Sequence, residues 1–388
     1  MNTVPSVAAP ATRERINVMK PWMGEEEARA IAEVVASGWV AQGPRTAAFE
    51  AAFAKHQGVA HAVATSSCTT ALHLALLVAG VKAGDDVLVP SFSFIATANA
   101  PTYVGAHPVF VDVEAGTGNV SVQTLERGLT VATTAVIVVD QGGIPVDLSP
   151  IRRWCDIHGL KLIEDAACAA GSTYQGGPVG RGADLSAWSF HPRKLLTTGE
   201  GGMLTTNNAA WAQRARKLRE HAMGVSAAER HTALVAPAES YAEIGYNFRM
   251  TDLQAAMGLV QLGKLDAMVA RRRELVGKYR VAIKDIDGLE LVADPDHGTS
   301  NFQSCWIRVQ PGYPLDREGL LAHLAKRGIS ARRGIMAAHL QPAYAHIRAG
   351  ELPVTEALAR DTLILPLYHQ LSDTDQQRVI DALANPKE

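Results

Sequence analysis

A lysine in the segment SFHPRKLLTTGEGGM, residues 189–203, is the first candidate for chemistry in this sequence. Lys194 follows an apolar run that ends near Ser189, and it precedes the glycine-rich GEGG. Most lysines lie on the surface because an ammonium group is costly to bury, which is the simplest interpretation of Lys194 taken alone. A glycine cluster loses much chain entropy on folding and therefore indicates tight backbone geometry. The glycines favour a lysine that is held in a specific position.

Two adjacent carboxylates, Glu164 and Asp165, end the apolar run of the segment LIEDAACAAGS. A buried carboxylate is costly unless a cation or a protonated ring lies beside it. Asp165 is therefore a candidate partner for a positively charged ligand group. The alternative is that Asp165 caps the next turn, and the segment alone favours neither role.

The segment ATSSCTTALHLALL, residues 64–77, predicts a strand end followed by a helix. Residues 66–70 would present N–H groups and hydroxyls at the helix N-terminus, an arrangement that suits a phosphate dianion. An ordinary Ser/Thr N-cap is the simpler interpretation of this segment by itself.

Aromatic and polar residues follow predicted strands at two further places. Phe92 and Phe94 lie in VPSFSFIATANA, where they either close a core or stack on a flat ring. The segment GYNFRMTDLQAA carries Asn247 and Arg249 before a helix that Thr251 is expected to cap. Core packing and loop stabilisation are the simpler interpretations of these residues.

Taken together, a phosphate cradle, a carboxylate, a stacking ring and a lysine match the needs of pyridoxal 5'-phosphate (PLP). This cofactor requires a lysine for a Schiff base and an acid for its pyridine nitrogen, while the protein supplies orientation and electrostatics. The combination is more specific than any of its members.

The elements that must position these residues form a regular pattern. Short β-branched runs alternate with helical segments, which predicts an α/β fold with helices covering a mostly parallel sheet. The predicted strands are HAVAT, DDVLVPSF, PVFVDV, AVIVVDQ, LKLIEDA, LSAWSF and GGMLTTN. Ligands of such sheets bind at the carboxyl ends of the strands, where the candidate residues lie.

The predicted organisation has three parts: a flexible N-terminal arm at residues 1–15, a large PLP-binding α/β domain at residues 16–255 and a smaller C-terminal α+β domain at residues 256–388. A long helical stretch after residue 249 is expected to bend or break near Gly263. The final helix is expected to begin after Ser372, with Asp375 three residues further on in a capping-box pattern.

Composition narrows the class of protein. The 388 residues include 37 basic and 39 acidic side chains, and without a block of Lys and Arg this balance argues against nucleic-acid binding. The 4 cysteines are scattered without a CxxC pair, so no metal site is expected and a reducing compartment is favoured. Neither a signal peptide nor an apolar run of roughly 18 residues, as a membrane span needs, is apparent. The expectation is a cytoplasmic enzyme.

The sequence resembles the DegT/DnrJ/StrS family of sugar aminotransferases, which have the fold-type I architecture of aspartate aminotransferase. The resemblance covers almost the whole chain and is carried by SGWVAQGPRTAAFE, SSCTTALHLAL, GDDVLVPSFSFIATANA, IEDAACAAGS, SFHPRKLLTTGEGGM, GYNFRMTDLQAA and PLYHQLSDTDQQRVIDAL. It implies that Lys194 bonds to PLP and then shuttles a proton between the amino acid and the cofactor. Asp165 would keep the pyridine nitrogen protonated, while Phe94 would stack on one ring face and Ala167 would lie against the other.

The resemblance also implies a phosphate site built by Ser189 and by the segment at Cys68 and Thr69. Asn247 is expected to reach the phosphate bound by the neighbouring subunit, which makes the protein a homodimer with shared active sites. Two residues depart from the commonest family pattern. Cys68 replaces a frequent glycine, and Cys168 stands where many relatives carry Gln or His near the cofactor O3'. A thiol is a weaker hydrogen-bonding group than either of those side chains.

The implied reaction moves an amino group from an amino acid, L-glutamate by analogy, to a nucleotide-linked 4-keto or 3-keto deoxyhexose in amino-sugar biosynthesis. Between the two half-reactions the cofactor would carry the amino group as pyridoxamine 5'-phosphate (PMP). His221, Arg249 and His339 are candidate substrate contacts because they lie in loop-like segments.

Two alternative functions remain open. One is a keto-cyclitol aminotransferase of the aminoglycoside type with L-glutamine as donor, and the other is a PLP- or sugar-binding regulatory protein without turnover. Lys194, which related dehydratases replace with His, favours transamination over deoxygenation. The presence of both Lys194 and Asp165 argues against a protein that only binds.

Overall fold

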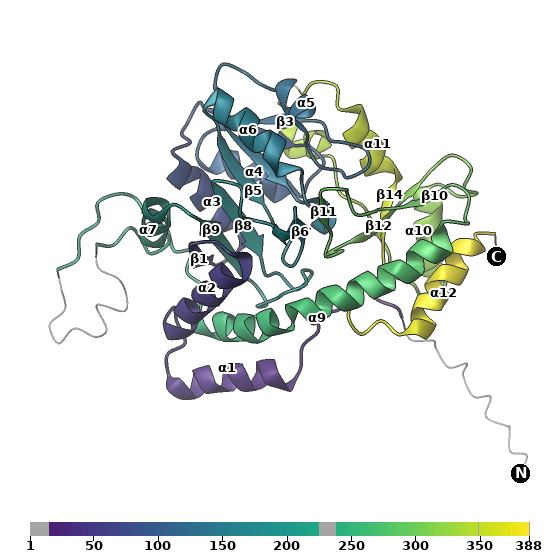
Figure 1. Cartoon of the computed structure of the whole chain (residues 1–388), viewed down its shortest axis with the longest axis horizontal. Coiled ribbons are helices and arrows are strands. Elements are labelled where there is room, and N and C mark those ends of the chain that lie inside the picture. The colour runs from purple at the N-terminus through teal and green to yellow at the C-terminus, as the bar shows by residue number, and fades with distance from the viewer. Residues whose placement is uncertain (1–14, 225–237, 348, 388) are drawn as a thin grey trace, which may run out of the picture.

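A seven-stranded sheet forms the centre of the larger part of the protein (Figure 1). The computed structural model describes residues 15–224, 238–347 and 349–387, so the predicted arm at residues 1–15 lies outside the described residues except for Arg15. The strand order is β1-β9-β8-β5-β4-β2-β3, in which β9 is antiparallel to both neighbours and the other pairs are parallel. The strands are β1 (His61–Thr65), β2 (Asp86–Pro90), β3 (His107–Val111), β4 (Thr133–Val139), β5 (Lys161–Asp165), β8 (Leu185–Ser189) and β9 (Gly202–Thr206). The predicted fold class, an α/β protein with a mostly parallel mixed sheet, is confirmed.

Helices cover both faces of this sheet, because each strand sends alternate apolar side chains to opposite sides. Val87 packs on the face covered by α3, α4 and α7, whereas Leu88 packs on the other face with α5 and α6. The helices of this part are α1 (Glu25–Ser37), α2 (Pro44–Gln57), α3 (Cys68–Ala79), α4 (Ile95–Tyr103), α5 (Val122–Glu126), α6 (Leu148–His158) and α7 (Ala209–Leu218), with a 3₁₀ turn η1 (Gln141–Gly143).

A four-stranded antiparallel sheet of order β10-β12-β14-β13, called the small sheet below, organises the C-terminal part. Its elements are β10 (Leu289–Leu291), β12 (Cys305–Val309), β13 (Arg332–Arg333), β14 (Thr362–Leu365), α10 (Arg317–Lys326), α11 (Pro353–Asp361), α12 (Asp373–Ala384), η2 (Ala338–Leu340) and η3 (Pro342–Tyr344). Ser372 caps α12 by accepting a hydrogen bond from the Asp375 amide at 3.0 Å, as the sequence predicts. A third sheet, of three short strands in the order β11-β6-β7, joins β6 (Thr173–Tyr174) and β7 (Gly177–Pro178) to β11 (Gly298–Thr299).

The long helix α9 (Asp252–Ile283) connects the two parts. It packs against α1 and α2 as well as against α12 and β10, and in Figure 1 it runs from the large sheet to the C-terminal helices. Its 32 residues are continuous, so the expected break near Gly263 is wrong. One glycine inside a helix costs only about 1 kcal/mol, which the packing of the rest of α9 offsets. The predicted division at residue 255 falls in the first turn of α9 and remains a prediction.

The start of the described chain attaches to the small sheet, although the sequence division placed it in the large domain. The Ile16 amide donates to the Gly328 carbonyl at 2.9 Å, and the Ser330 amide donates to the Ile16 carbonyl at 2.8 Å. The segment thereby forms a parallel bridge with Ile329, just before β13, the edge strand of this sheet.

Candidate active site

A cavity of about 360 Å³ lies between the carboxyl ends of the large-sheet strands and the small sheet. It is the place that sheet topology predicts for a ligand. Most of the predicted cofactor residues line this single cavity, namely Cys68, Thr69, Phe94, Asp165, Ala167, Cys168, Ser189 and Lys194. The fold therefore brings together residues that are up to 126 positions apart, from Cys68 to Lys194.

Lys194 lies in the loop between β8 and β9, where its side chain faces the cavity. Its amide donates to the His191 carbonyl at 2.8 Å, which fixes the backbone turn, and its Nζ donates to Cys168 Sγ at 3.1 Å. Burial lowers the pKa of the Lys194 amine. Cys168, Cys68 and Asp165 together raise it by more than burial lowers it, so the net pKa is above its ordinary value. In the cofactor-free protein these acidic neighbours favour the protonated form of the amine.

The glycines that follow Lys194 allow this loop to return to the sheet. Gly199 adopts the left-handed region at φ +82°, which favours glycine. A Cβ on Gly202 would lie 2.3 Å from the Ser67 carbonyl carbon and 2.6 Å from the Cys68 nitrogen. Gly202 thus lets β9 pass directly against the start of α3, in agreement with the tight geometry that GEGG predicts.

Asp165 ends β5 with 5% of its surface exposed. Its Oδ2 accepts a hydrogen bond from Thr97 Oγ1 at 2.7 Å, and its Oδ1 accepts from the Ala167 amide at 3.2 Å. Burial raises the pKa of Asp165, while Thr97 and Lys194 oppose this rise. The carboxylate is held rigidly at the cavity wall, where a protonated ring nitrogen would compensate its charge.

Glu164 points away from the cavity because it precedes Asp165 on the strand and alternate residues face opposite sides. Its Oε2 accepts a hydrogen bond from Ser186 Oγ at 2.9 Å. Burial raises the pKa of Glu164 to about 7. Of the two adjacent carboxylates in the sequence, Asp165 is the one that lines the cavity.

The N-terminus of α3 faces the same cavity. Ser67 is the N-cap and accepts a hydrogen bond from the Thr70 amide at 3.2 Å, so that its hydroxyl serves the helix. The first-turn amides of Cys68 and Thr69 have no partner within the helix, as is general for this position. They suit a phosphate group. The capping and phosphate interpretations of this segment are therefore compatible.

The Cys68 thiol is directed to Asp165, with Sγ 3.8 Å from Oδ1. Burial and the Asp165 charge raise the pKa of this thiol well above its ordinary value, so it remains protonated and can donate. The Cys68 side chain thus supports the carboxylate, and only its backbone is placed for phosphate.

Phe94 and Ser189, the predicted contacts for a flat ring and a phosphate, both line the cavity. Phe94 is the residue before α4, exposes 64% of its surface and lines the cavity, in contrast with Phe92, which is 1% exposed and belongs to the core. Ser189 ends β8, next to the loop that carries Lys194. The two phenylalanines therefore divide the roles that the sequence left open.

Four predicted residues do not line this cavity: Asn247, His221, Arg249 and His339. Asn247 is exposed and pairs with Glu220 in an isolated bridge, and His221 is exposed with φ 61°. The His339 ring contacts Ser91 Oγ at 2.6 Å and Glu356 at 3.5 Å, so its partners lie outside the cavity. Tertiary contacts account for His339, whereas the role of Asn247 at a neighbouring subunit remains a prediction.

Sequence reasoning missed several residues that line or support the cavity. Thr97 supports Asp165, Gln141 follows β4 at the carboxyl edge of the sheet, and Arg193 and Arg332 contribute positive charge. The strand-end rule gives a signal for Gln141, and Arg193 is adjacent to the lysine. Thr97 lies in VPSFSFIATANA, where the sequence drew attention only to the phenylalanines, and Arg332 comes from a segment without any local signal.

Residues 21–384 match the model of the DegT/DnrJ/EryC1/StrS aminotransferase family. The chain belongs to this family. It is 38% identical over 377 residues to a dTDP-4-dehydro-2,3,6-trideoxy-D-glucose 4-aminotransferase from Saccharopolyspora spinosa, which covers 94% of this chain and 95% of that protein. The resemblance to this family that the sequence motifs indicate is confirmed.

Solved structures of family members have the same fold. The aminotransferase TlmJ from Streptoalloteichus hindustanus has a TM-score of 0.89 at 38% identity and covers 96% of this chain and 98% of its own. The sugar aminotransferase Spr1654 from Streptococcus pneumoniae in its PMP form has a TM-score of 0.89 at 27% identity, over 96% of this chain and 98% of its own.

The protein is a PLP-dependent aminotransferase, as members of this family are. The cavity fits that cofactor on independent grounds: Asp165 is a buried carboxylate at its wall, Phe94 is an exposed ring that lines it, and the N-terminus of α3 faces it. No helix among residues 15–224, 238–347 and 349–387 is long and apolar enough to cross a membrane.

Proposed function

We propose that this enzyme transfers an amino group from an amino acid, L-glutamate first, to the keto group of a nucleotide-linked 4-keto or 3-keto deoxyhexose in amino-sugar biosynthesis. The observation that supports it is the presence of Lys194 and Asp165 on the wall of one cavity beside the α3 N-terminus. The relative from Saccharopolyspora spinosa, whose name states a dTDP-linked keto-sugar, supports the substrate class.

Each residue has a defined task in this reaction. Bound PLP supplies an electron sink that makes the Cα proton of an amino acid removable. Lys194 Nζ takes that proton as a general base and returns it as a general acid. Asp165 holds the proton on the ring nitrogen, and Thr97 holds Asp165 through the 2.7 Å hydrogen bond. For the keto acceptor, the same groups act in reverse order.

The test follows the two half-reactions separately. The PLP-loaded enzyme is titrated with L-glutamate and, in parallel, with L-glutamine, while its visible absorbance and the 2-oxo acid product are measured. The amino donor should remove the visible absorbance band of the PLP-loaded enzyme. Addition of dTDP-4-dehydro-2,3,6-trideoxy-D-glucose should then restore this band. If a keto-cyclitol restores the band and the sugar does not, the cyclitol alternative is correct. If no amino acid changes the band, the protein is a binder and the proposal fails.

We further propose a cytoplasmic homodimer in which Asn247 serves the partner's active site. The exposure of Asn247 outside the cavity of its own chain supports this arrangement, and the four cysteines, all free, fit a reducing compartment. Light scattering measures the assembly. A mixture of inactive Lys194→Ala and Asn247→Ala chains, after subunit exchange, should regain activity because one shared site is then intact. If Asn247 served its own chain, mixing would restore nothing.

A further inference from the structure

Two arginines, Arg193 and Arg332, line the active-site cavity and come from different parts of the chain. Arg193 lies in the loop after β8 of the large sheet, and Arg332 lies on β13 of the small sheet. Within residues 15–224, 238–347 and 349–387, neither guanidinium forms an ion pair with a carboxylate. Both charges are therefore available to a ligand.

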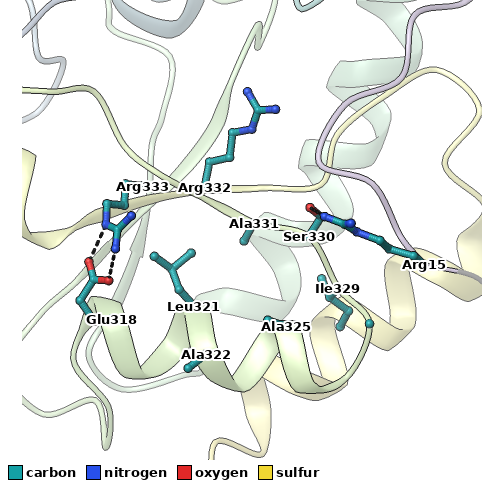
Figure 2. Close-up of a pocket in the computed structure, with 11 residues that line it drawn as sticks. Arg15, Glu318, Leu321, Ala322, Ala325, Ile329, Ser330, Ala331, Arg332 and Arg333 are labelled. Atoms are coloured by element: carbon teal, nitrogen blue, oxygen red, sulfur yellow. Dashed lines mark hydrogen bonds and ion pairs between the residues drawn. The ribbon is translucent and has the colours of Figure 1, made fainter.

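The direction of Arg332 follows from strand pairing. Arg332 is opposite Ile364 on β14, and both line the cavity, so they share the face that is turned to it. Arg333, the next residue, is opposite the buried Leu363 and turns to the other face, where its guanidinium binds Glu318 at 2.9 and 2.6 Å. Figure 2 shows this split: Arg333 reaches Glu318 beside α10, and Arg332 points away from that helix.

The backbone of Arg193 is fixed at both of its polar groups. Its amide donates to His191 Nδ1 at 3.1 Å, and its carbonyl accepts from Gln303 Nε2 at 2.5 Å. Gln303 precedes β12 of the small sheet, so this hydrogen bond connects the Arg193 loop to the part of the protein that carries Arg332. The two arginines are thus held by connected elements.

The charges on the cavity wall do not cancel. The charged residues that line it are the basic Arg193, Lys194, Arg272 and Arg332 and the acidic Asp165 and Glu200. Arg272 already donates to the Phe302 and Gln303 carbonyls at 2.9 Å each, and Asp165 is bound by Thr97. Burial and the charge of Arg193 both lower the pKa of Arg332, which indicates that the two cations repel each other. An anion between them would remove this cost.

We propose that Arg193 and Arg332 form an anion subsite that binds an oxygen anion of the substrate. The inference rests on the proposed aminotransferase function. Two anions are available in that reaction, the carboxylate of the amino donor and the diphosphate of the nucleotide sugar, and a guanidinium binds either through paired hydrogen bonds. Arg193 and Lys194 line the same cavity, so an anion bound at this subsite would orient the substrate within the cavity that holds the reacting amine.

The test measures binding without turnover. Glutarate, an unreactive dicarboxylate, and dTDP are titrated by calorimetry into PLP-loaded wild-type enzyme and into Arg193→Gln, Arg332→Gln and Arg332→Lys. Loss of one charged hydrogen-bonding group should weaken the binding of the probe that occupies the subsite by about 10- to 100-fold. Arg332→Lys should recover part of this affinity. Weaker glutarate binding identifies the donor carboxylate, and weaker dTDP binding identifies the diphosphate.

Arg333→Gln is the matched control because it removes the same charge from the same strand on the opposite face. It should bind both probes as wild type does. If Arg193→Gln and Arg332→Gln also bind both probes like wild type, or if Arg333→Gln weakens them equally, the subsite assignment is wrong. Failure of the proposed function is a different result, since it appears as wild-type enzyme whose absorbance no amino acid changes.

Discussion

Lys194 Nζ lies 3.1 Å from Cys168 Sγ, which makes the thiol the direct hydrogen-bonding partner of the amine on which the chemistry depends. Cys168 is also one of the two residues, with Cys68, at which the sequence departs from the commonest family pattern. The contact indicates that Cys168 positions Lys194 whenever its amine is free.

Replacement of Cys168 with Ala should therefore release the amine. Because Cys168 raises the pKa of Lys194, that pKa should fall in Cys168→Ala, and kcat should fall by about 3- to 10-fold. The pH dependence of amine labelling at Lys194 in cofactor-free protein, read by mass spectrometry, measures the pKa. Cys168→Ser retains a hydrogen-bonding group, so its Lys194 pKa and its kcat should lie between those of the wild type and Cys168→Ala. An unchanged labelling profile in Cys168→Ala contradicts the positioning role.

Lys194→Ala should lower kcat/KM by roughly 10²- to 10⁴-fold, the usual contribution of a general acid and base. The variant should retain the fold, because the Lys194 side chain lies at the cavity and not in a core cluster. Amino transfer from L-glutamate measures the loss, and circular dichroism controls for folding. Full activity in this variant would remove Lys194 from the mechanism.

Thr97→Val should move the acidic limb of the pH–rate profile to higher pH. The Thr97 hydroxyl lowers the pKa of Asp165 against the effect of burial, so its removal raises this pKa further. Activity needs the carboxylate, and kcat/KM on the acidic side should fall about tenfold. Thr97→Ser retains the donor and should keep the wild-type profile. A Thr97→Val profile that drops uniformly at all pH values would indicate a structural defect instead.

Gly202→Ala should weaken PLP binding and destabilise the protein by about 1–3 kcal/mol. The added Cβ would meet backbone atoms of Ser67 and Cys68 at 2.3 and 2.6 Å, which displaces the start of α3. Gly263→Ala is the control, because nothing lies within 4 Å of its Cβ and the helix should gain about 0.5–1 kcal/mol. Urea unfolding and PLP titration measure both effects, and equal behaviour of the two variants would contradict the close approach.

Glu164 should make stability depend on pH. Its pKa of about 7 in the folded protein is raised from 4.5, so the folded state holds a proton that the unfolded chain has lost between these values. Its contribution is complete below pH 4.5 and is lost as pH rises through 7. Glu164→Gln should remove this loss. Urea unfolding at pH 5 and pH 8 should show a smaller difference in the variant, and an equal difference would exclude Glu164 as the cause.

Local sequence signals predicted most of the residues that line the active-site cavity, because these residues lie at or just after strand ends. Lys194, Asp165 and Phe94 each follow an apolar run, and parallel strands bring such positions to one edge. The same rule could not separate Asp165 from Glu164 by residue type, since the two faces of a strand are assigned only when the strand is packed. It also could not show that Gly263 leaves α9 intact, because packing along the helix offsets its cost.

The sequence by itself determined the order of strands and helices along the chain, the Ser372 cap and the candidate residues for PLP binding, because these depend on residue types and contacts close together in the chain. Only the tertiary structure decided that Thr97 holds Asp165, that Cys168 meets Lys194, and that Arg332 faces the cavity while Arg333 does not. These relationships join segments that are distant in sequence, so no local pattern encodes them. They follow from the register of the strands and from the way the small sheet closes over the large one.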